Sequence, residues 1–350
     1  MKFTQYIYIL ITYLLVSSCS TTHLSQVKRN PSSLKLNYSC QKLISTIFYA
    51  NPYNQVYALR KFSYSEAVAE FTSNLARRKS QIKPGSEPFI MTQPHGKPGK
   101  TVLILHGFSD SPGTIRAVAD MYYKRGYHVV APLYNDHGLL PEFQKEALLN
   151  GSLKKWREDV DLAAAIAKGL SNDENIHVAG YSMGGSLVKD LTIRMPGLVS
   201  SITYWAPLFK ENGPVYTLGL ILFKWFKYGW DKGTTSDIFY QSMSYHMTQE
   251  MHRLTRQIKP YVLRQHDDIP TAIFRVDRAT ETTVDDDIID RFADVNSIGD
   301  NRHFIYENDD VKYKVLHRDA TSDVVHLSRE VNPAISFFRT RFNSFFNEIE

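Results

Sequence analysis

The chain has 350 residues, of which 43% are hydrophobic and 22% are charged, and its formal net charge at pH 7 is +5. These values exclude collagen-like, low-complexity and wholly disordered chains, which differ strongly from this composition. The length suits one large α/β domain or two small ones. The basic residues are scattered, and no stripe of Lys and Arg interleaved with aromatic residues occurs, so nucleic-acid binding is not expected.

The N-terminus has the features of a targeting signal. Lys2 precedes an apolar run of eleven residues, Tyr6 to Val16, whereas a helix that spans a bilayer needs about 20 residues. The run therefore has the length of a signal peptide. Its last residue begins the segment Val16 to Cys19 (VSSC), which resembles a bacterial lipobox, where cleavage leaves a Cys that is diacylated. The resemblance implies a signal peptide over 1–18 and a lipid on Cys19, and the alternative is an ordinary secretory signal with an incidental Cys.

The residues after this Cys predict a tether and a location in the cell envelope. Residues 19–33 are mostly polar and contain Pro31, as is typical of a linker between an anchor and a domain. Ser20, rather than an Asp, follows Cys19, and by resemblance to enterobacterial sorting rules this implies the outer membrane. Cys40 has no intramolecular partner if Cys19 carries lipid, so we expect a small buried residue and no disulfide.

Strands and helices alternate through the rest of the chain. The continuous apolar run Thr101 to Leu105 (TVLIL) is typical of a strand buried on both faces of a parallel sheet. The expected strands are 101–105, 128–133, 176–179, 200–205, 271–276 and 312–316. The expected helices are 112–124 with Ser111 as its N-cap, 153–170, 182–195 and 333–350. This alternation predicts βαβ units and a mostly parallel sheet with flanking helices.

Residues 208–269 interrupt the alternation. They separate two expected strands by about sixty residues, far more than one crossover helix needs. They include an apolar, aromatic segment, Val215 to Trp230. We therefore expect an inserted helical cap over 208–269, whose aromatic residues mostly form its own core, and an α/β core made of 34–207 and 270–350.

A candidate nucleophile lies between the expected strand 176–179 and the expected helix 182–195. Gly180 to Gly184 (GYSMG) matches the G-x-S-x-G pattern in the strand–turn–helix context that this pattern requires. A sharp turn there would raise the Ser182 hydroxyl above the sheet, and the helix N-terminus would add a positive dipole. The pattern predicts a nucleophilic Ser182, the alternative being a glycine-rich turn with a surface serine.

Three segments together resemble α/β-hydrolases of the monoacylglycerol-lipase and carboxylesterase type. These segments are Leu103 to Phe108, Pro132 to Gly138 and Gly180 to Gly185. The likeness covers roughly residues 85–345 and departs from the family at Asp136, which replaces the first Gly of a G-H-G turn. The resemblance implies an α/β-hydrolase fold, an acyl-enzyme intermediate and no cofactor.

The resemblance also implies an oxyanion hole. In this family the amide after the H-G turn and the amide after the nucleophile point at the oxyanion, which here are the backbone N–H groups of Phe108 and Met183. Each such donor contributes about 3–4 kcal/mol to transition-state stabilisation in comparable sites. His106 of the same turn is expected to have a structural role.

The base is expected near the end of the chain, because the triad order in this fold is Ser, acid, His. After the last expected strand only His317 and His326 remain. The family places its base in the loop before the final helix, which implies His326. We interpret His317 as a residue that caps the strand end or faces solvent.

The acid is expected within residues 276–285. Glu281 stands three residues before Val284, a spacing that the acid commonly has in the resembling esterases, and is our prediction. Asp277, directly after an expected strand, is the alternative. Asp285 is better explained as a cap of the helix that follows it.

The sequence predicts a lipid-anchored serine hydrolase that cleaves short- or medium-chain esters or monoacylglycerol-like lipids, because the expected cap is apolar. No H-E-x-x-H, paired Cys or glycine-rich phosphate loop is present, so neither a metal nor a nucleotide cofactor is expected. One alternative is a peptidase or amidase of the same fold, in which Glu211 or Glu250 would hold the substrate amine. Another is a non-catalytic envelope lipoprotein that keeps the fold as a binding scaffold.

Overall fold

The computed structural model describes residues 53, 59–173, 175–211, 230–231, 242–264, 268–276, 283–297, 303–307, 320–321, 331–332 and 334–350. The chain divides into two compact units, Met1–Gln55 and Val56–Glu350, and every element below belongs to the second. The expected signal peptide, the tether with Cys19, and Cys40 lie outside the described residues. Among the helices that are described, none has the length and apolar character needed to cross a membrane.

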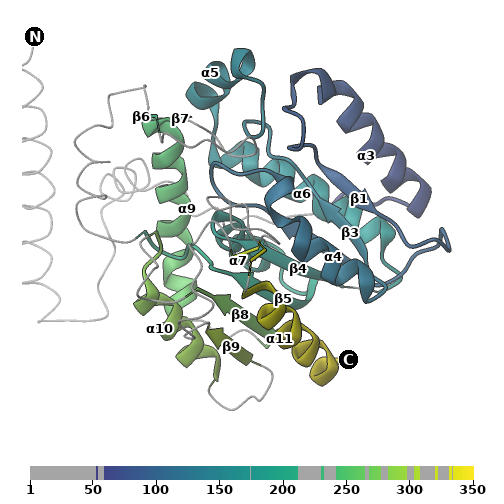
Figure 1. Ribbon diagram of the computed structural model, residues 1–350, viewed down its shortest axis with the longest axis vertical. Coiled ribbons are helices and arrows are strands. Elements are labelled where there is room, and N and C mark those ends of the chain that lie inside the picture. Colours follow the sequence, from purple (N-terminus) through teal and green to yellow (C-terminus); the bar gives the residue numbers. More distant parts are fainter. Residues whose placement is uncertain are drawn as a thin grey trace, which may run out of the picture. The chain divides into compact units, whose positions relative to one another are not determined.

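A seven-stranded sheet with the order β1-β3-β2-β4-β5-β8-β9 forms the centre of the fold (Figure 1). Its strands are β1 (Phe89–Met91), β2 (Thr101–Leu105), β3 (His128–Ala131), β4 (Ile176–Tyr181), β5 (Val199–Trp205), β8 (Thr271–Arg275) and β9 (His303–Glu307). Only the β1–β3 pair is antiparallel, and the other five neighbouring pairs are parallel. This confirms the predicted, mostly parallel α/β sheet.

Helices cover both faces of the sheet (Figure 1). The described helices are α3 (Tyr64–Arg78), α4 (Arg116–Lys124), α5 (Pro141–Asn150), α6 (Leu153–Leu170), α7 (Met183–Arg194), α9 (Tyr245–Arg264), α10 (Asp286–Ser297) and α11 (Ala334–Ile349), of which α3, α5 and α9 pack mainly on other helices. Short 3-10 turns lie at η2 (Lys79–Gln81) and η3 (Pro112–Ile115), and a separate antiparallel pair joins β6 (Trp230–Asp231) to β7 (Ser242–Met243). The described parts of the connections between parallel strands therefore contain helices, as the alternation predicted.

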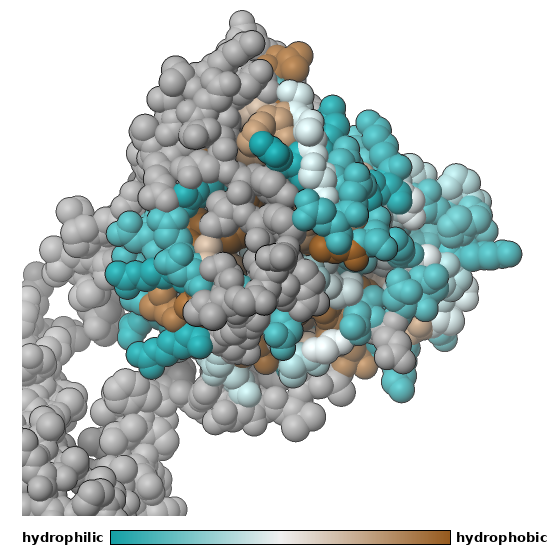
Figure 2. All heavy atoms as spheres, turned by 90° about the horizontal axis from the view of Figure 1, so that it is seen from below, coloured by the Kyte–Doolittle hydropathy of each residue, from teal (hydrophilic) through white to brown (hydrophobic). Residues whose placement is uncertain are grey.

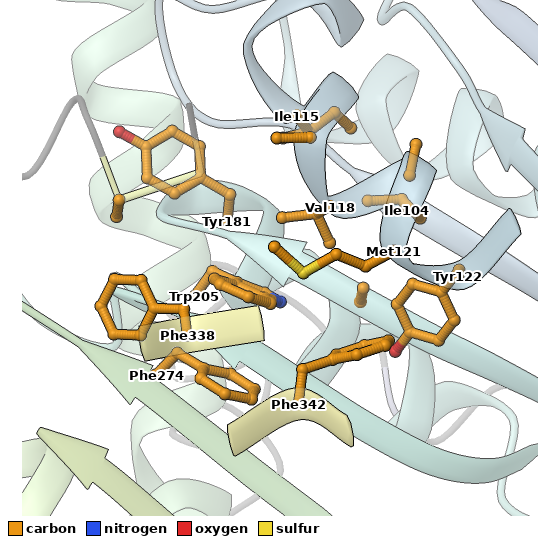
Figure 3. Packing of buried hydrophobic residues seen from close by; sticks show 14 of the residues in the cluster. Ile104, Ile115, Val118, Met121, Tyr122, Tyr181, Trp205, Phe274, Phe338 and Phe342 are labelled. Atoms are coloured by element: carbon orange, nitrogen blue, oxygen red, sulfur yellow. The ribbon is translucent and has the colours of Figure 1, made fainter. Parts of the chain in front are cut away.

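One aromatic core attaches the last helix to the sheet (Figure 3). The Trp205 and Phe274 rings, from the neighbouring strands β5 and β8, stack with centroids 4.2 Å apart. Phe338 of α11 meets Trp205 edge-on at 5.7 Å. All three side chains are at most 1% exposed. Their burial removes large apolar surfaces from water and fixes α11 against the strands that precede it.

The start of the helix expected at 112–124 differs from the prediction. Its first four residues form the 3-10 turn η3, and the Ser111 side chain makes no capping bond. Instead the Ser111 carbonyl accepts bonds from the Thr114 N–H (3.1 Å) and the Thr114 hydroxyl (2.9 Å). The i to i+3 geometry of a 3-10 turn brings these donors to a backbone carbonyl rather than to the side chain of the preceding residue.

The described surface has little continuous apolar area. On the face in Figure 2 hydrophilic side chains predominate among the described residues, and hydrophobic ones occupy small separate areas. The exposed large hydrophobic residues of the described part are Phe143 and Val331. The predicted segment Val215 to Trp230 lies, apart from its last residue, outside the described residues, so the cap over 208–269 stays a prediction.

Candidate active site

The turn between β4 and α7 holds Ser182 in a strained conformation. Its φ of 52° and ψ of −119° lie in a region that L-residues rarely adopt, and such strain is concentrated at functional sites. The Ser182 N–H donates to the Trp205 carbonyl at 3.0 Å, and its own carbonyl accepts from Gly185 and Leu208, both at 2.9 Å. Backbone bonds from two neighbouring segments therefore keep the turn in this shape.

Glycine is required on both sides of Ser182. A Cβ atom at Gly184 would collide with the backbone carbonyls of Leu105 and His106, and one at Gly180 would collide with the Gly184 carbonyl. These contacts are to backbone, which cannot move aside as a side-chain end can. The G-x-S-x-G pattern is thus explained by the close packing of β2, the turn and the start of α7.

The turn after β2 lies beside Ser182. Strands β2 and β4 are parallel neighbours with Leu105 opposite Gly180, so both chains leave the sheet at the same edge. A Cβ atom at Gly107 would lie 3.2 Å from the Ser182 Cβ. Phe108 follows Gly107 directly, and Met183 is the first residue of α7, where backbone N–H groups have no partner within the helix. The structure thus brings together the two segments that carry the predicted oxyanion donors.

His106 has structural contacts. It is fully buried, its Nδ1 lies 2.9 Å from the Gly107 carbonyl oxygen, and its ring centroid is 4.0 Å from that of Tyr134. Burial lowers the pKa of His106 to about 3, so its imidazole is neutral and Nδ1–H donates to the carbonyl. These contacts agree with the structural role expected for His106.

The Asp136 carboxylate explains the departure from the family's G-H-G turn. It is 3% exposed, and its Oδ2 accepts a hydrogen bond from the indole Nε1–H of Trp156 on α6 at 3.0 Å. Burial raises the pKa of Asp136, and this hydrogen bond partly offsets the rise. The carboxylate therefore ties the turn after β3 to α6, a role that sequence reasoning missed because its partner is twenty residues away.

The residues predicted for the acid and the base lie outside the described residues. They are Glu281, its alternative Asp277, His326 and His317. Strand β8, which precedes the acid segment, runs parallel to β5 and is followed by the buried Val276. The acid segment therefore starts at the same edge of the sheet as Ser182. The Asp285 Oδ1 accepts a bond from the Ile288 N–H at 3.3 Å, which confirms its interpretation as a helix cap.

The two glutamates considered for binding a substrate amine have protein partners. Glu211 accepts from the Thr255 hydroxyl at 3.0 Å and lies 3.3 Å from the His252 Nδ1. Glu250 accepts from the Leu153 N–H at 3.0 Å, at the start of α6. Both carboxylates are 7% exposed or less, so these contacts disfavour a role in gripping a peptide N-terminus. In the part of the chain that the structure describes, no cluster of three or more His, Cys, Asp or Glu could hold a metal ion.

Comparison with known proteins identifies the family. Residues 96–282 match the family described as Serine aminopeptidase, S33. A carboxylesterase of Bacillus subtilis (strain 168) is 32% identical over 124 residues, which are 35% of this chain and 47% of that protein. A thermostable monoacylglycerol lipase of Bacillus sp. (strain H-257) is 32% identical over 114 residues, 33% of this chain and 42% of that protein. The matched segment thus spans less than half the length of either relative.

Solved structures agree on the fold. A structure of the metagenome-derived lipolytic enzymes LipS and LipT superposes with a TM-score of 0.60 at 16% identity and covers 77% of this chain and 100% of that chain. The monoacylglycerol lipase of Paleococcus ferrophilus gives 0.54 at 12% identity, covering 75% and 100%. At these identities the likeness shows the fold alone, and it confirms the predicted α/β-hydrolase fold. With its strained G-x-S-x-G turn, its H-G turn and the match over 96–282, the chain belongs to the Serine aminopeptidase, S33, family of α/β-hydrolases.

Proposed function

We propose that this protein is a carboxylic ester hydrolase that uses Ser182 as nucleophile, His326 as base and Glu281 as acid. The observation that carries the proposal is the strained Ser182 turn packed against the H-G turn, so closely that a Cβ atom at Gly107 would lie 3.2 Å from the Ser182 Cβ. The carboxylesterase and monoacylglycerol lipase relatives support ester hydrolysis.

The proposed reaction has two halves. The Ser182 Oγ attacks the acyl carbon while His326 takes its proton, and the Phe108 and Met183 N–H groups bind the developing oxyanion. The leaving alcohol takes the proton from His326, which leaves an ester between Ser182 and the acyl group. His326 then removes a proton from water, the hydroxide attacks this ester, and Ser182 regains its proton as the carboxylic acid leaves. Glu281 holds the imidazole tautomer and stabilises the imidazolium.

Short- or medium-chain esters, or monoacylglycerol-like lipids, are the proposed substrates. The apolar residues of the expected cap, Val215 to Trp230, support this choice. We also propose that acylation of Cys19 keeps the enzyme at the bacterial envelope membrane, where such lipids reside. The support for this anchor is the lipobox-like segment Val16 to Cys19 after an apolar run of signal-peptide length.

The experiment that tests the proposal compares ester with amide substrates on the purified chain. We expect hydrolysis of a series of p-nitrophenyl acyl esters and labelling by a fluorophosphonate probe, both abolished in Ser182→Ala. Labelling that persists in this variant contradicts the assignment of the nucleophile. Cleavage of aminoacyl anilides without cleavage of esters would instead favour the peptidase alternative, which the family's description suggests and the occupied Glu211 and Glu250 carboxylates disfavour.

Near-isosteric variants test the acid. Glu281→Gln is expected to lower kcat by about 10⁴, the loss seen when a triad Asp becomes an amide, and Asp277→Asn is expected to stay near wild type. The opposite pattern would assign the acid to Asp277.

A further inference from the structure

Residues 210 and 211, which follow β5 at the start of the expected cap, bind the residues that end the acid segment. Glu211 and Val284 form an antiparallel β-bridge. The Asp285 N–H donates to the Lys210 carbonyl at 3.0 Å, and the Lys210 ammonium pairs with the Asp285 carboxylate. We call these four residues the acid-loop clamp. They connect two segments that lie about seventy positions apart in the sequence.

The Glu211 side chain extends the clamp to a third segment. Its carboxylate, 6% exposed, accepts from the Thr255 hydroxyl at 3.0 Å and lies 3.3 Å from the His252 Nδ1, both on α9. Helix α9 packs on α7, the helix that begins at the Ser182 turn. Leaving a buried carboxylate without its partners costs free energy of folding. The Glu211 side chain therefore fixes the end of the acid segment against α9.

The clamp is next to one acid candidate and distant along the chain from the other. Glu281 is three residues before Val284, so chain length alone keeps their Cα atoms within about 11 Å. Asp277 directly follows Val276, which is buried just after β8 ends. The clamp therefore fixes the end of the acid segment, three residues after Glu281 in the sequence, whereas β8 fixes its start, just before Asp277.

We propose that Glu211 is a positioning residue for the triad acid, acting through Val284 and Asp285 on Glu281 without touching the substrate. This inference rests on the proposed function.

A double-mutant cycle on the full chain tests the inference. Glu211→Ala removes both side-chain bonds to α9 but retains the backbone bridge, and Glu211→Gln retains an acceptor for the Thr255 hydroxyl. With a fluorogenic ester we expect Glu211→Ala to lower kcat about tenfold with KM within twofold, and Glu211→Gln to restore most of the loss. In the Glu281→Gln background, Glu211→Ala should change kcat by less than twofold, since the residue through which it acts is gone.

Glu250→Ala is the matched control. Glu250, like Glu211, is a buried glutamate, but it belongs to α9 and accepts a bond from the start of α6 rather than contacting the acid segment. It should leave kcat within twofold of wild type. If Glu211→Ala fails to fold, the cycle is run with Glu211→Gln, for which a smaller loss of about threefold is expected. Equal losses in both backgrounds, or no loss in the wild-type background, overturn the inference.

The proposed function is checked first and separately. A wild-type chain that cleaves no ester, or a Ser182→Ala variant that still does, refutes the proposed function and the clamp's role with it. If esters are cleaved through Ser182 but Glu281→Gln remains near wild type, the function stands and the positioning role of Glu211 is overturned.

Discussion

A buried ionic network joins the nucleophile helix to its neighbours, and its centre is Asp190 on α7. Both Asp190 oxygens lie 3.1 Å from the Arg157 Nε, and Oδ2 accepts from the Arg194 Nε at 2.7 Å. Arg157 of α6 also donates to Gln257 of α9 at 2.7 Å. Arg194 continues the network to Asp161 on α6 at 2.6 Å. The Asp190 carboxylate thus links α7 to α6 directly and to α9 through Arg157.

Replacing Asp190 by Ala should destabilise the fold strongly. The side chains of Asp190 and Arg194 are 0% exposed and that of Arg157 is 14% exposed, so the variant leaves two guanidinium groups without their central counter-charge. Breaking a buried ion pair from one side costs about 3–5 kcal/mol. Asp161 is 29% exposed, and water can replace part of its interaction. Asp161→Ala is therefore expected to cost about 1 kcal/mol or less, near the range of surface pairs.

Urea unfolding of wild type, Asp190→Ala and Asp161→Ala at pH 7 measures the difference. The midpoint of Asp190→Ala should fall by about 1 M or more, because a loss of about 3–5 kcal/mol is divided by an m-value of about 1–3 kcal/mol/M. Burial opposes ionisation of Asp190, but Arg194 and Arg157 outweigh it and hold the pKa of the carboxyl below its usual value. If the two variants lose the same free energy of unfolding, or if Asp190→Ala loses less than 1 kcal/mol, the reasoning from burial is wrong.

Three further predictions concern the turn, the last helix and the anchor. Ser182→Gly should be more stable to unfolding than the equally inactive Ser182→Ala by about 1 kcal/mol, because glycine adopts a φ of 52° without strain; a less stable Gly variant in thermal melts would contradict this. Glu350 accepts bonds from Tyr127, Lys100 and Arg125, which outweigh burial and lower its pKa to about 2. The stabilisation by Glu350 should be full above its unfolded pKa of about 4.3 and be lost as the pH falls towards 2. Melting temperatures of wild type and Glu350→Gln should therefore differ at pH 7 and converge near pH 2, and a constant difference would argue against it. Cys19→Ser should move the protein out of the membrane fraction or leave its signal peptide uncleaved, as followed by fractionation and palmitate labelling, and labelling that survives the change would refute lipidation at Cys19.

Local sequence was sufficient to predict the elements with strong apolar patterns. Strand β2 has the predicted bounds Thr101–Leu105, and α6 has the predicted bounds Leu153–Leu170. All five residues of β2 are buried. Its side chains therefore form one nearly continuous apolar run instead of alternating between apolar and polar residues, and such a run is easily recognised in the sequence. The nucleophile turn was equally readable, because the five adjacent residues Gly180 to Gly184 carry the whole pattern between a strand and a helix, although the contacts that require glycine at 184 come from the end of β2.

Weak local patterns hid other elements. Strand β9 lies at His303–Glu307, where polar and charged residues surround a short apolar core, and only pairing with β8 makes it a strand. The strand expected at 312–316 lies outside the described residues. Helix α3 was not predicted either, although Ser63 and Glu66 form a capping box at its start. It precedes the part of the chain that the family resemblance covers.

Only the tertiary structure decided which polar residues meet. Asp136 binds Trp156, Asp190 binds Arg157, and Glu211 joins α9 to the end of the acid segment, across separations of 20, 33 and more than 40 positions. Nothing in the neighbouring sequence marks these carboxylates, because a charged residue on a surface and one in a buried network have the same local pattern. The partners are selected by the order of the strands and the packing of the helices, so their roles follow from the fold rather than from the motifs within it.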